Sequence, residues 1–315
     1  MELRHLRYFL MVAQEQNFTR AAIRLNMQQP PLSQQIKTLE AELGFDLFRR
    51  HPKGVDLTPG GIVFLQEARD ILNRVEDAAR RSAKVAQGYE GALSIGFTSS
   101  AAAHSLIPSF IRAYREAYPG VSLLLNEGSA RELTDDVIHR KLEIGILRAP
   151  VSEPFEMAFH QLFEEDMLLV LPVGHPLLVR SRKESEESND ESMPAISLKH
   201  LADESFILVR RSGATGMYSK LIEACENAGF TPKIAFEVER MLTNINLVAA
   251  GAGVSVVPAS MNGFHRESVV YCSIKAEPRL VAPITLICRK EDQGPILHNF
   301  ITLAKRIAGD YVPRV

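Results

Sequence analysis

One long helix constrains this 315-residue chain more than any other feature of its sequence. Thr58 is a natural N-cap with Pro59 at the first helical position, and Gly88 stands where a C-terminal glycine would end the helix. Nothing between them ends the helix, so the segment predicts a helix of nearly thirty residues, about 40 Å long at 1.5 Å per residue. The helix therefore separates a short N-terminal part from a much longer C-terminal part.

The long helix carries an apolar stripe that needs a partner. Steps of three and four residues alternate along it, as in a coiled coil. The stripe consists of Ile62, Leu65, Ala68, Leu72, Val75, Ala79, Ser82 and Ala86. A lone helix of this length cannot bury the stripe, so the helix packs either on a second copy or on the C-terminal part of its own chain. We favour a homodimer.

Three short helices are predicted before the long one. Leu3, Leu6, Phe9, Leu10 and Ala13 recur at helical spacing. Asn17 caps a second helix over 18–25, and a third begins at 30–31, where two prolines open it, and ends at Gly44. A tight turn before the third helix is typical of a helix-turn-helix, whose last helix fits a DNA major groove about 12 Å wide.

The third helix, at 30–42, turns a polar face outward, opposite an apolar stripe of leucine and isoleucine. That face consists of Pro30, Pro31, Ser33, Gln34, Lys37 and Thr38. Gln can pair with adenine, Ser with several base edges, and Lys with guanine or phosphate. A solvated three-helix bundle is the alternative that the spacing leaves open.

Two short strand-like runs over 47–57 surround a Pro/Gly turn. They predict a hairpin wing whose Arg49, Arg50 and Lys53 reach DNA phosphates, which position a protein without reading sequence. The charge distribution agrees with a basic N-terminal reader. Residues 1–87 hold 13 Lys and Arg against 10 Asp and Glu, whereas the whole chain has a net charge of −2.

Composition limits which classes of protein this chain can belong to. With 46% hydrophobic and 23% charged residues the chain is globular, and its 3 cysteines are too few and too scattered for a disulfide framework or a Cys-based zinc site. There is no 18-residue apolar run, and charges at the start disfavour a signal peptide. We therefore expect a soluble cytoplasmic protein that uses no membrane and no metal.

A dense set of N-terminal residues resembles the signature of LysR-type transcriptional regulators. The matching stretches are Asn17-Phe18-Thr19-Arg20-Ala21-Ala22, Gln29-Pro30-Pro31-Leu32-Ser33 and Leu57-Thr58-Pro59-Gly60-Gly61. The Gln-Pro-Pro-Leu-Ser form is most similar to the branch that regulates aromatic-compound catabolism. The resemblance implies that Thr19, Arg20 and Gln29 join the residues that contact promoter DNA. It also implies a homodimer or homotetramer that acts as an activator with RNA polymerase as a further partner, with repression as the alternative.

From residue 89 onward, short apolar strands alternate with helices. Strands are predicted at 92–97, 121–125, 144–147, 167–171, 206–209, 234–238, 254–257 and 284–288. This alternation indicates an α/β fold with a largely parallel sheet, in two similar lobes with a cleft between them. The effector-binding part of LysR-type regulators resembles a periplasmic solute-binding protein, in which the chain crosses twice between lobes. By that resemblance the crossings lie near Phe163–Glu165 and Glu267–Val270.

The resulting domain organisation has an N-terminal winged helix-turn-helix and a two-lobed α/β effector domain. The winged helix-turn-helix spans 1–58 and the dimerising linker helix 59–88. Lobe I of the effector domain spans 89–163 and 268–315, and lobe II spans 164–267.

Polar residues that follow the strands predict a ligand site in the cleft, because ligands bind beyond the carboxyl ends of such strands. The candidates are Thr98, Ser99, Ser100, Ser129 and Arg148 from the first lobe, and Arg210, Arg211, Ser212, Glu239 and Thr243 from the second. Hydroxyl and guanidinium groups suit a carboxylate, so we expect a small organic acid as inducer, with an aromatic or muconate-like acid as the candidate. Helix capping by the serines and interlobe salt bridges of the arginines are the alternatives.

No sequence motif supports catalysis or a cofactor. The Gly251-Ala252-Gly253 run precedes a strand and lacks the third glycine of a dinucleotide loop, and no Gly-x-Ser-x-Gly elbow or phosphate loop occurs. We therefore expect an inducer-responsive DNA-binding regulator and no enzyme. A solute-binding protein or an enzyme that uses the cleft are the alternatives, and the winged N-terminus disfavours both.

Overall fold

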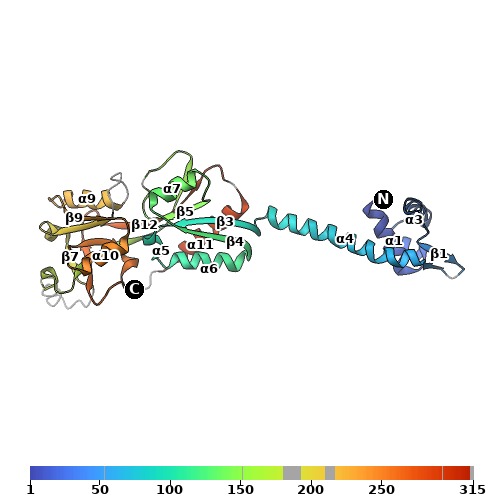
Figure 1. The fold of residues 1–315 in the computed structure, drawn as a ribbon, viewed down its shortest axis with the longest axis horizontal. Helices are drawn as coiled ribbons and strands as arrows, with labels where there is room; N and C mark the ends of the chain where they lie inside the picture. Colours follow the sequence, from blue (N-terminus) through green and yellow to red (C-terminus); the bar gives the residue numbers. More distant parts are fainter. Residues whose placement is uncertain (53, 151, 180–192, 210–216, 293, 313–315) are drawn as a thin grey trace. The chain divides into compact units, whose positions relative to one another are not determined.

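A computed structural model of the chain describes residues 1–52, 54–150, 152–179, 193–209, 217–292 and 294–312. The chain folds into two compact units, Met1–Ala86 and Gln87–Val315. The N-terminal unit contains α1 (Leu3–Glu15), α2 (Phe18–Arg24), α3 (Gln29–Leu43), β1 (Phe48–His51), β2 (Gly54–Leu57) and α4 (Pro59–Ala86) (Figure 1). This is the predicted winged helix-turn-helix followed by the long helix.

Local capping explains these boundaries. The Asn17 side chain accepts a hydrogen bond of 3.0 Å from the Arg20 amide at the start of α2. Gly44 ends α3 at φ +80°, a left-handed conformation that favours glycine. The Thr58 hydroxyl accepts a hydrogen bond of 2.9 Å from the Gly61 amide in the first turn of α4. The three helices and the wing share one core that includes Phe9, Leu32 and Ile36.

The C-terminal unit is built on a mixed sheet in the order β4-β3-β5-β12-β6-β11-β7, with β10 also paired to β6. Lobe I contains β3 (Glu90–Phe97), β4 (Gly120–Glu127), β5 (Ile144–Leu147) and β12 (Val281–Arg289). Helices α6 (Leu106–Ala117) and α11 (Pro295–Gly309) cover one face of these strands and α7 (Ala130–Ile138) covers the other (Figure 1). The short helix α5 (Ser99–Ala102) follows β3.

Lobe II contains β7 (Ala195–Ser197), β10 (Ser255–Pro258) and β11 (Val269–Lys275), together with a parallel pair formed by β8 (Ser205–Val209) and β9 (Lys233–Val238). Helices α9 (Met217–Asn227) and α10 (Met241–Ala249) and the 3-10 turns η1 (Leu198–Leu201) and η2 (Ala259–Met261) complete it. Two apolar clusters form its core, one around Phe206 and the other around Ile245.

The strand β6 (Met157–Pro172) connects the two lobes. Residues 157–166 pair with β12 of lobe I, and residues 167–172 pair with β10 and β11 of lobe II. Because β6 runs antiparallel to all three partners, the sheet is mixed, and the expectation of a largely parallel sheet is corrected.

The second crossing also differs from the expectation near Glu267–Val270. β11 pairs with β6 and with β7, so residues 269–275 belong to lobe II and the chain returns to lobe I between Lys275 and Val281. No periodicity in the sequence distinguishes a strand that continues one lobe from a strand that begins the next. Of the helices that the structure describes, none is both long enough and apolar enough to span a membrane.

Candidate functional site

The outward face of α3 is positioned as the sequence predicts. Leu32, Ile36 and Leu39 are fully buried, so the opposite side of the helix faces solvent. Pro30, Pro31, Gln34 and Lys37 are exposed there, whereas Ser33 and Thr38 are half-buried. The Thr38 hydroxyl donates to the Gln34 carbonyl at 3.0 Å and is therefore already engaged within the helix.

Two partly buried contacts orient α3 on the rest of the unit. The ring of His5 on α1 lies 2.8 Å from Gln35 Oε1. Glu40 accepts hydrogen bonds from the amides of Leu47 and Phe48 at 2.9 and 3.1 Å, which ties α3 to the start of the wing. The outward side chains therefore project from a helix whose rotation is restrained on two sides.

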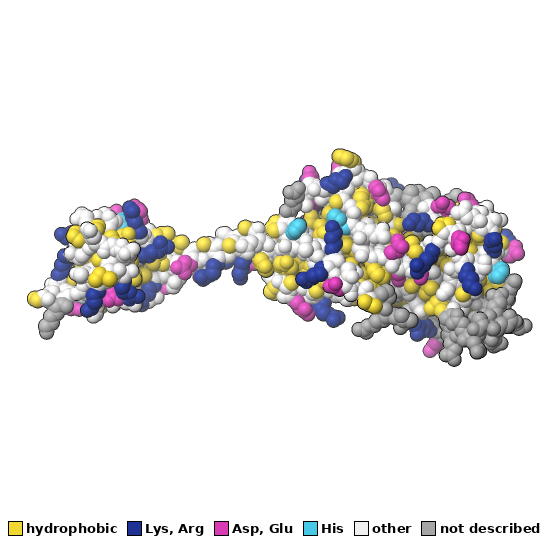
Figure 2. Space-filling model, turned by 180° about the vertical axis from the view of Figure 1, so that it is seen from behind, with side chains coloured by type: hydrophobic (Ala, Val, Ile, Leu, Met, Phe, Trp, Pro, Cys, Tyr) yellow, Lys and Arg dark blue, Asp and Glu magenta, His cyan; other side chains and the backbone are white. Residues whose placement is uncertain are grey.

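The basic residues around α3 differ in their freedom to reach DNA. The guanidinium of Arg50 lies 4.8 Å from the centre of the Phe18 ring and donates to the Ser33 hydroxyl at 3.0 Å, which connects the wing to α3. Arg20 donates to the Glu15 carbonyl at 2.6 Å. Thr19 and Arg49 are exposed, and Lys53 lies outside the described residues. The basic side chains of this unit are visible in dark blue in Figure 2.

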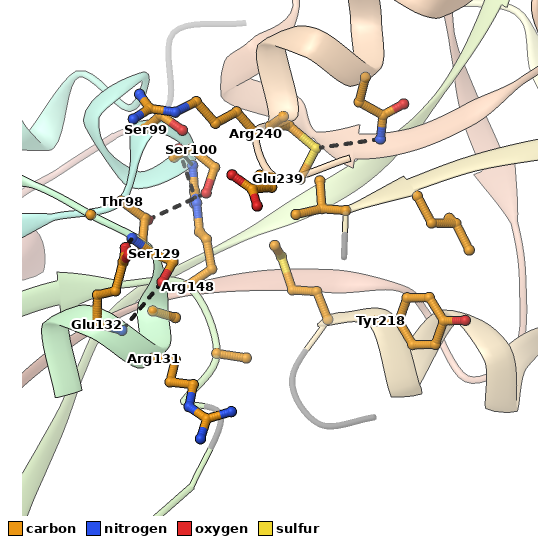
Figure 3. Close-up of a pocket in the computed structure, with 18 of the residues that line it drawn as sticks. Thr98, Ser99, Ser100, Ser129, Arg131, Glu132, Arg148, Tyr218, Glu239 and Arg240 are labelled. Atoms are coloured by element: carbon orange, nitrogen blue, oxygen red, sulfur yellow. Dashed lines mark hydrogen bonds between the residues drawn. The ribbon is translucent and has the colours of Figure 1, made fainter. Parts of the chain in front are cut away.

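In the C-terminal unit, a cavity of about 590 Å³ lies between lobe I and lobe II. Its walls differ in character. Lobe I contributes mainly hydroxyl and charged groups from Thr98, Ser99, Ser100, Ser129 and Arg131. Lobe II contributes Tyr218, Glu239, Arg240 and Asn244 and a larger number of apolar side chains, which are those of Met167, Leu208, Val209, Met217, Leu221, Met241 and Val256. Figure 3 shows the polar wall and, across from it, Tyr218.

The hydroxyls of the polar wall also cap helices. The Thr98 hydroxyl accepts from the Ala101 amide at 3.2 Å, and the Ser129 hydroxyl accepts from the Glu132 amide at 3.2 Å. Glu132 accepts in turn from the Ser129 amide at 2.8 Å, which lowers the pKa of its carboxyl. Capping and ligand binding are compatible, since a hydroxyl that accepts one hydrogen bond can still donate another.

Arg148 lies along this wall and is already surrounded by partners. Its side chain is 3% exposed, and its guanidinium donates to the Ser100 carbonyl and, at 2.8 Å, to the Ser260 hydroxyl. Nη1 lies 2.5 Å from Glu165 Oε1, which is ion-pair distance although the N–H does not point along a hydrogen bond. Burial lowers the pKa of Arg148, and the Glu165 carboxylate opposes that shift. The alternative of a salt bridge is therefore observed for Arg148, although its partner Glu165 lies on the part of β6 that pairs with lobe I. The contact that crosses to lobe II is the hydrogen bond to Ser260, and Arg148 also lines the cavity.

Two other arginines line the cavity that were not among the site residues predicted from the sequence. Arg240 pairs with Glu127 at 2.6 Å, which connects the N-terminus of α10 to the end of β4. Arg131 is exposed in the first turn of α7 and forms no salt bridge with any residue that the structure describes. No sequence signal identified either residue, because helix position alone does not reveal which turn faces a cavity.

The lobe II candidates are placed unevenly. Glu239 lines the cavity, and its carboxylate lies near Arg240 and Ser100 in Figure 3. Thr243 is exposed and does not line the cavity, whereas its neighbour Asn244 is buried and does. Successive side chains on a helix differ by about 100° in direction, which explains why only one of the two neighbours lines the cavity. Arg210, Arg211 and Ser212 lie outside the described residues.

Neither unit offers an evident metal site within its described ranges, where no group of three or more His, Cys, Asp or Glu side chains is arranged to hold an ion. Burial lowers the pKa of His104 and raises that of Cys272 to about 12. Both shifts disfavour the charged form of the group and neither group lines the cavity. The cavity therefore combines hydroxyl groups, charged groups of both signs and an apolar surface, which suits the binding of a small molecule more than catalysis.

Comparison with known proteins covers both units. Residues 3–62 match the family described as bacterial regulatory helix-turn-helix protein, lysR family, and residues 86–308 match the LysR substrate binding domain. The chain is 35% identical to the HTH-type transcriptional regulator AlsR of Bacillus subtilis over 96% of this chain and 95% of AlsR. It is 30% identical to the regulator BenM of Acinetobacter baylyi over 98% of this chain and 96% of BenM.

Solved structures extend the similarity to three dimensions. The crystal structure of CbnR, a LysR family transcriptional regulator, superposes with a TM-score of 0.77 at 30% identity and covers 96% of this chain and 100% of CbnR. Full-length CbnR in complex with its target DNA superposes with a TM-score of 0.75, also at 30% identity, over 98% of this chain and 100% of that one.

Proposed function

The chain belongs to the LysR family of bacterial transcriptional regulators, and from that premise we propose which residues and which ligand class it uses. It is a DNA-binding transcriptional regulator with an effector-binding domain. The observation that carries the proposal is that the chain has both features. The N-terminal unit has a helix with an exposed polar face, and the C-terminal unit has a cavity with a polar wall and an apolar wall.

We propose that α3 reads the major groove of promoter DNA. Gln34 and Lys37 contact base edges, and Pro30, Pro31, Gln29, Ser33 and Thr38 lie along the same interface. Thr19 and Arg20 on α2 and Arg49, Arg50 and Lys53 of the wing contact the phosphates. The restraints on α3 by His5 and Glu40 support this assignment, because a rigid helix presents its side chains at fixed positions in the groove.

Substitution of the reading side chains is expected to weaken operator binding. Gln34→Ala removes a bidentate amide and should cost about 1–3 kcal/mol, or about 5- to 150-fold in affinity, and should relax the sequence preference at one position. Lys37→Ala should also weaken binding, because it removes a donor to a base edge, and it should relax the sequence preference at its own position. Fluorescence anisotropy on an operator selected from random duplexes measures both effects.

Gln14→Ala is the matched control, since Gln14 is an exposed residue of α1 outside the proposed interface. If Gln34→Ala and Lys37→Ala both bind the operator as tightly as Gln14→Ala does, α3 is not the reading helix.

We further propose that the cavity binds a small organic acid, an aromatic or muconate-like acid being the candidate. Arg131 supports this choice, because a cation in the first turn of a helix adds to the positive potential of the helix N-terminus and favours an anion. The apolar wall of lobe II suits a hydrocarbon body. Thr98, Ser99, Ser100, Ser129, Arg148 and Glu239 are the proposed polar contacts.

We propose that binding of the acid to the lobes is coupled to the way in which the protein binds promoter DNA. The acid prefers one relative orientation of lobe I and lobe II, and this preference changes the packing of a homodimer or homotetramer on DNA. α4 is the proposed dimerising helix, since Ile62, Val63, Val75 and Val85 on it are exposed apolar side chains. The proposed regulator acts in the cytoplasm, with RNA polymerase as a further partner. A binding protein without a DNA role is disfavoured by the family membership.

Ligand addition is expected to stabilise the full chain. An acid that binds only the folded state adds RT ln(1 + [L]/Kd), about 2.7 kcal/mol at 100 times Kd, and so raises the melting temperature. Arg131→Ala should weaken that binding about 10- to 100-fold through loss of a charge-assisted hydrogen bond. Differential scanning fluorimetry with benzoate, cis,cis-muconate, phenylacetate and mandelate measures the shift.

Arg115→Ala on α6 controls for loss of an exposed arginine outside the cavity. Equal shifts for wild type, Arg131→Ala and Arg115→Ala would remove Arg131 from the site. No shift with any acid would argue against an organic-acid cavity altogether.

A further inference from the structure

The apolar wall of the cavity contains one buried amide that the proposed function does not use. Asn244 lies on α10 among the lining residues and is 1% exposed. Among the described residues, its Oδ1 has no hydrogen-bond partner. Its Nδ2 lies 4.0 Å from the sulfur of Met241, which is three residues earlier on the same helix.

This amide is poorly satisfied in either orientation. A thioether sulfur is a weak acceptor, so the contact with Met241 compensates little of the lost hydration of the amide N–H. Exchanging the oxygen and nitrogen positions would leave the N–H group unpaired in place of the carbonyl. Buried polar side chains in folded proteins nearly always have a partner, and an exception next to a cavity suggests that a ligand provides it.

The surroundings of Asn244 define what that partner is. Leu208, Met241 and Val256 of the same wall are apolar and accept only a hydrocarbon body. The hydroxyls of Thr98 and Ser100 line the cavity on the side of α5, and α10 packs against α5, so Asn244 lies on a helix next to the polar wall. A ligand whose carboxylate meets the polar wall therefore places its apolar body, and any substituent on that body, against α10.

We propose that Asn244 is a specificity-determining residue that hydrogen-bonds a hydroxyl or oxo group of the effector. The effector is then a hydroxy or oxo acid with an apolar body, and an unsubstituted acid is its weaker analogue. An amide can both donate to and accept from a hydroxyl group, and it can donate to an oxo group. The inference rests on the proposed organic-acid function of the cavity and specifies the substrate class within it.

Discrimination follows from the unpaired amide. An acid that lacks the substituent leaves Asn244 buried without a partner, whereas a hydroxy acid satisfies it, so the two should differ in affinity. We expect about a 10-fold difference, which corresponds to about 1.4 kcal/mol. Replacing Asn244 by an apolar residue of similar size should remove this difference mainly by weakening the hydroxy acid.

The test measures Kd by isothermal titration calorimetry on the full chain with two matched pairs. They are mandelate with phenylacetate, and 3-phenyllactate with 3-phenylpropionate. Wild type should bind each hydroxy acid about 10-fold more tightly than its partner. Asn244→Leu should reduce both ratios to about one. Asn246→Leu, at an exposed asparagine of the same helix, should leave the ratios unchanged.

Asn244→Leu should fold, since it places an apolar side chain in an apolar wall, and Asn244→Ala gives the same comparison should the leucine variant aggregate. Equal affinities within each pair in wild type, or ratios that persist in the Asn244 variants, overturn the inference while an organic-acid cavity stands. Absence of binding by all four acids overturns both the role of Asn244 and the organic-acid function of the cavity. The supporting outcome is a ratio present in wild type and in Asn246→Leu and lost in both Asn244 variants.

Discussion

Arg148→Ala is expected to lower the free energy of unfolding of the C-terminal unit by about 3–5 kcal/mol, because it leaves a carboxylate buried without its cation. The side chain of Glu165 is 8% exposed, and its oxygens accept from the Ser260 amide at 2.5 Å and the Ser260 hydroxyl at 2.8 Å. Those two hydrogen bonds remain in the variant but do not neutralise the charge. Urea unfolding followed by circular dichroism measures the loss.

The exposed ion pair of Arg140 with Glu291 provides the control for this measurement. Arg140 is 63% exposed, and surface pairs contribute about 0–1 kcal/mol, so Arg140→Ala should change stability little. The double variant Arg148→Met with Glu165→Leu should recover much of the loss, since it removes both charges from the interior. A stable Arg148→Ala protein would show that Glu165 finds water or another cation.

This expectation changes how an inducer defect in Arg148→Ala is interpreted. Arg148 contacts Ser100 of α5 and Ser260 of η2, so its loss disturbs both lobes as well as the cavity wall. Its removal alters stability and ligand contacts together. Arg131 is exposed and belongs to no such network within the described ranges, and Arg131→Ala is therefore the cleaner probe of anion binding.

Gly61→Ala should destabilise the N-terminal unit by about 3 kcal/mol or more and abolish operator binding with it. A Cβ at position 61 would lie 2.2 Å from the Leu47 carbonyl oxygen, and this backbone atom cannot move aside as the end of a flexible side chain could. α4 begins here, and its Thr58 cap bonds to both the Gly61 amide and the Leu47 carbonyl, so a shift would break the cap as well. Thermal unfolding of the full chain and operator titration measure the two effects.

Gly60→Ala distinguishes this clash from a general effect of alanine at the helix start. Its Cβ would clash with the ring of Phe45 at 2.9 Å and would make ordinary contact with Thr58 Oγ1 at 3.8 Å. The Phe45 side chain is 43% exposed, so it can rotate away. We expect a change below about 1 kcal/mol, since alanine is also the better helix former. Similar unfolding curves for the two variants would contradict the steric account.

The elements that the sequence predicted well depend on local signals. The start of α2 at Asn17, the end of α3 at Gly44 and the start of α4 after Thr58 each follow from a cap within a few residues. The apolar periodicity of α3 placed Leu32 and Ile36 inside, and the outward face of the helix followed from it. The family resemblance rested on the same segment and is confirmed.

The cleft was predicted less completely because its contacts join distant residues. Arg148 was expected to face a ligand, but its partners Glu165 and Ser260 lie far along the chain on other elements. On α10 the sequence indicated Thr243, and the packing of Ile245 and Met241 turns Asn244 toward the cavity instead. The return of the chain to lobe I after β11 depends on strand pairing, which apolar runs do not specify.

By itself, the sequence determined the order of the helices, the wing, the long helix and the alternating α/β part, because caps, turns and hydrophobic periodicity act over a few residues. The tertiary structure decided which charges are compensated by a partner, which helix face lines the cavity and where the chain crosses between the two lobes. Those properties depend on contacts between segments that are far apart in sequence, such as the pair of Arg148 and Glu165 and the approach of α10 to α5.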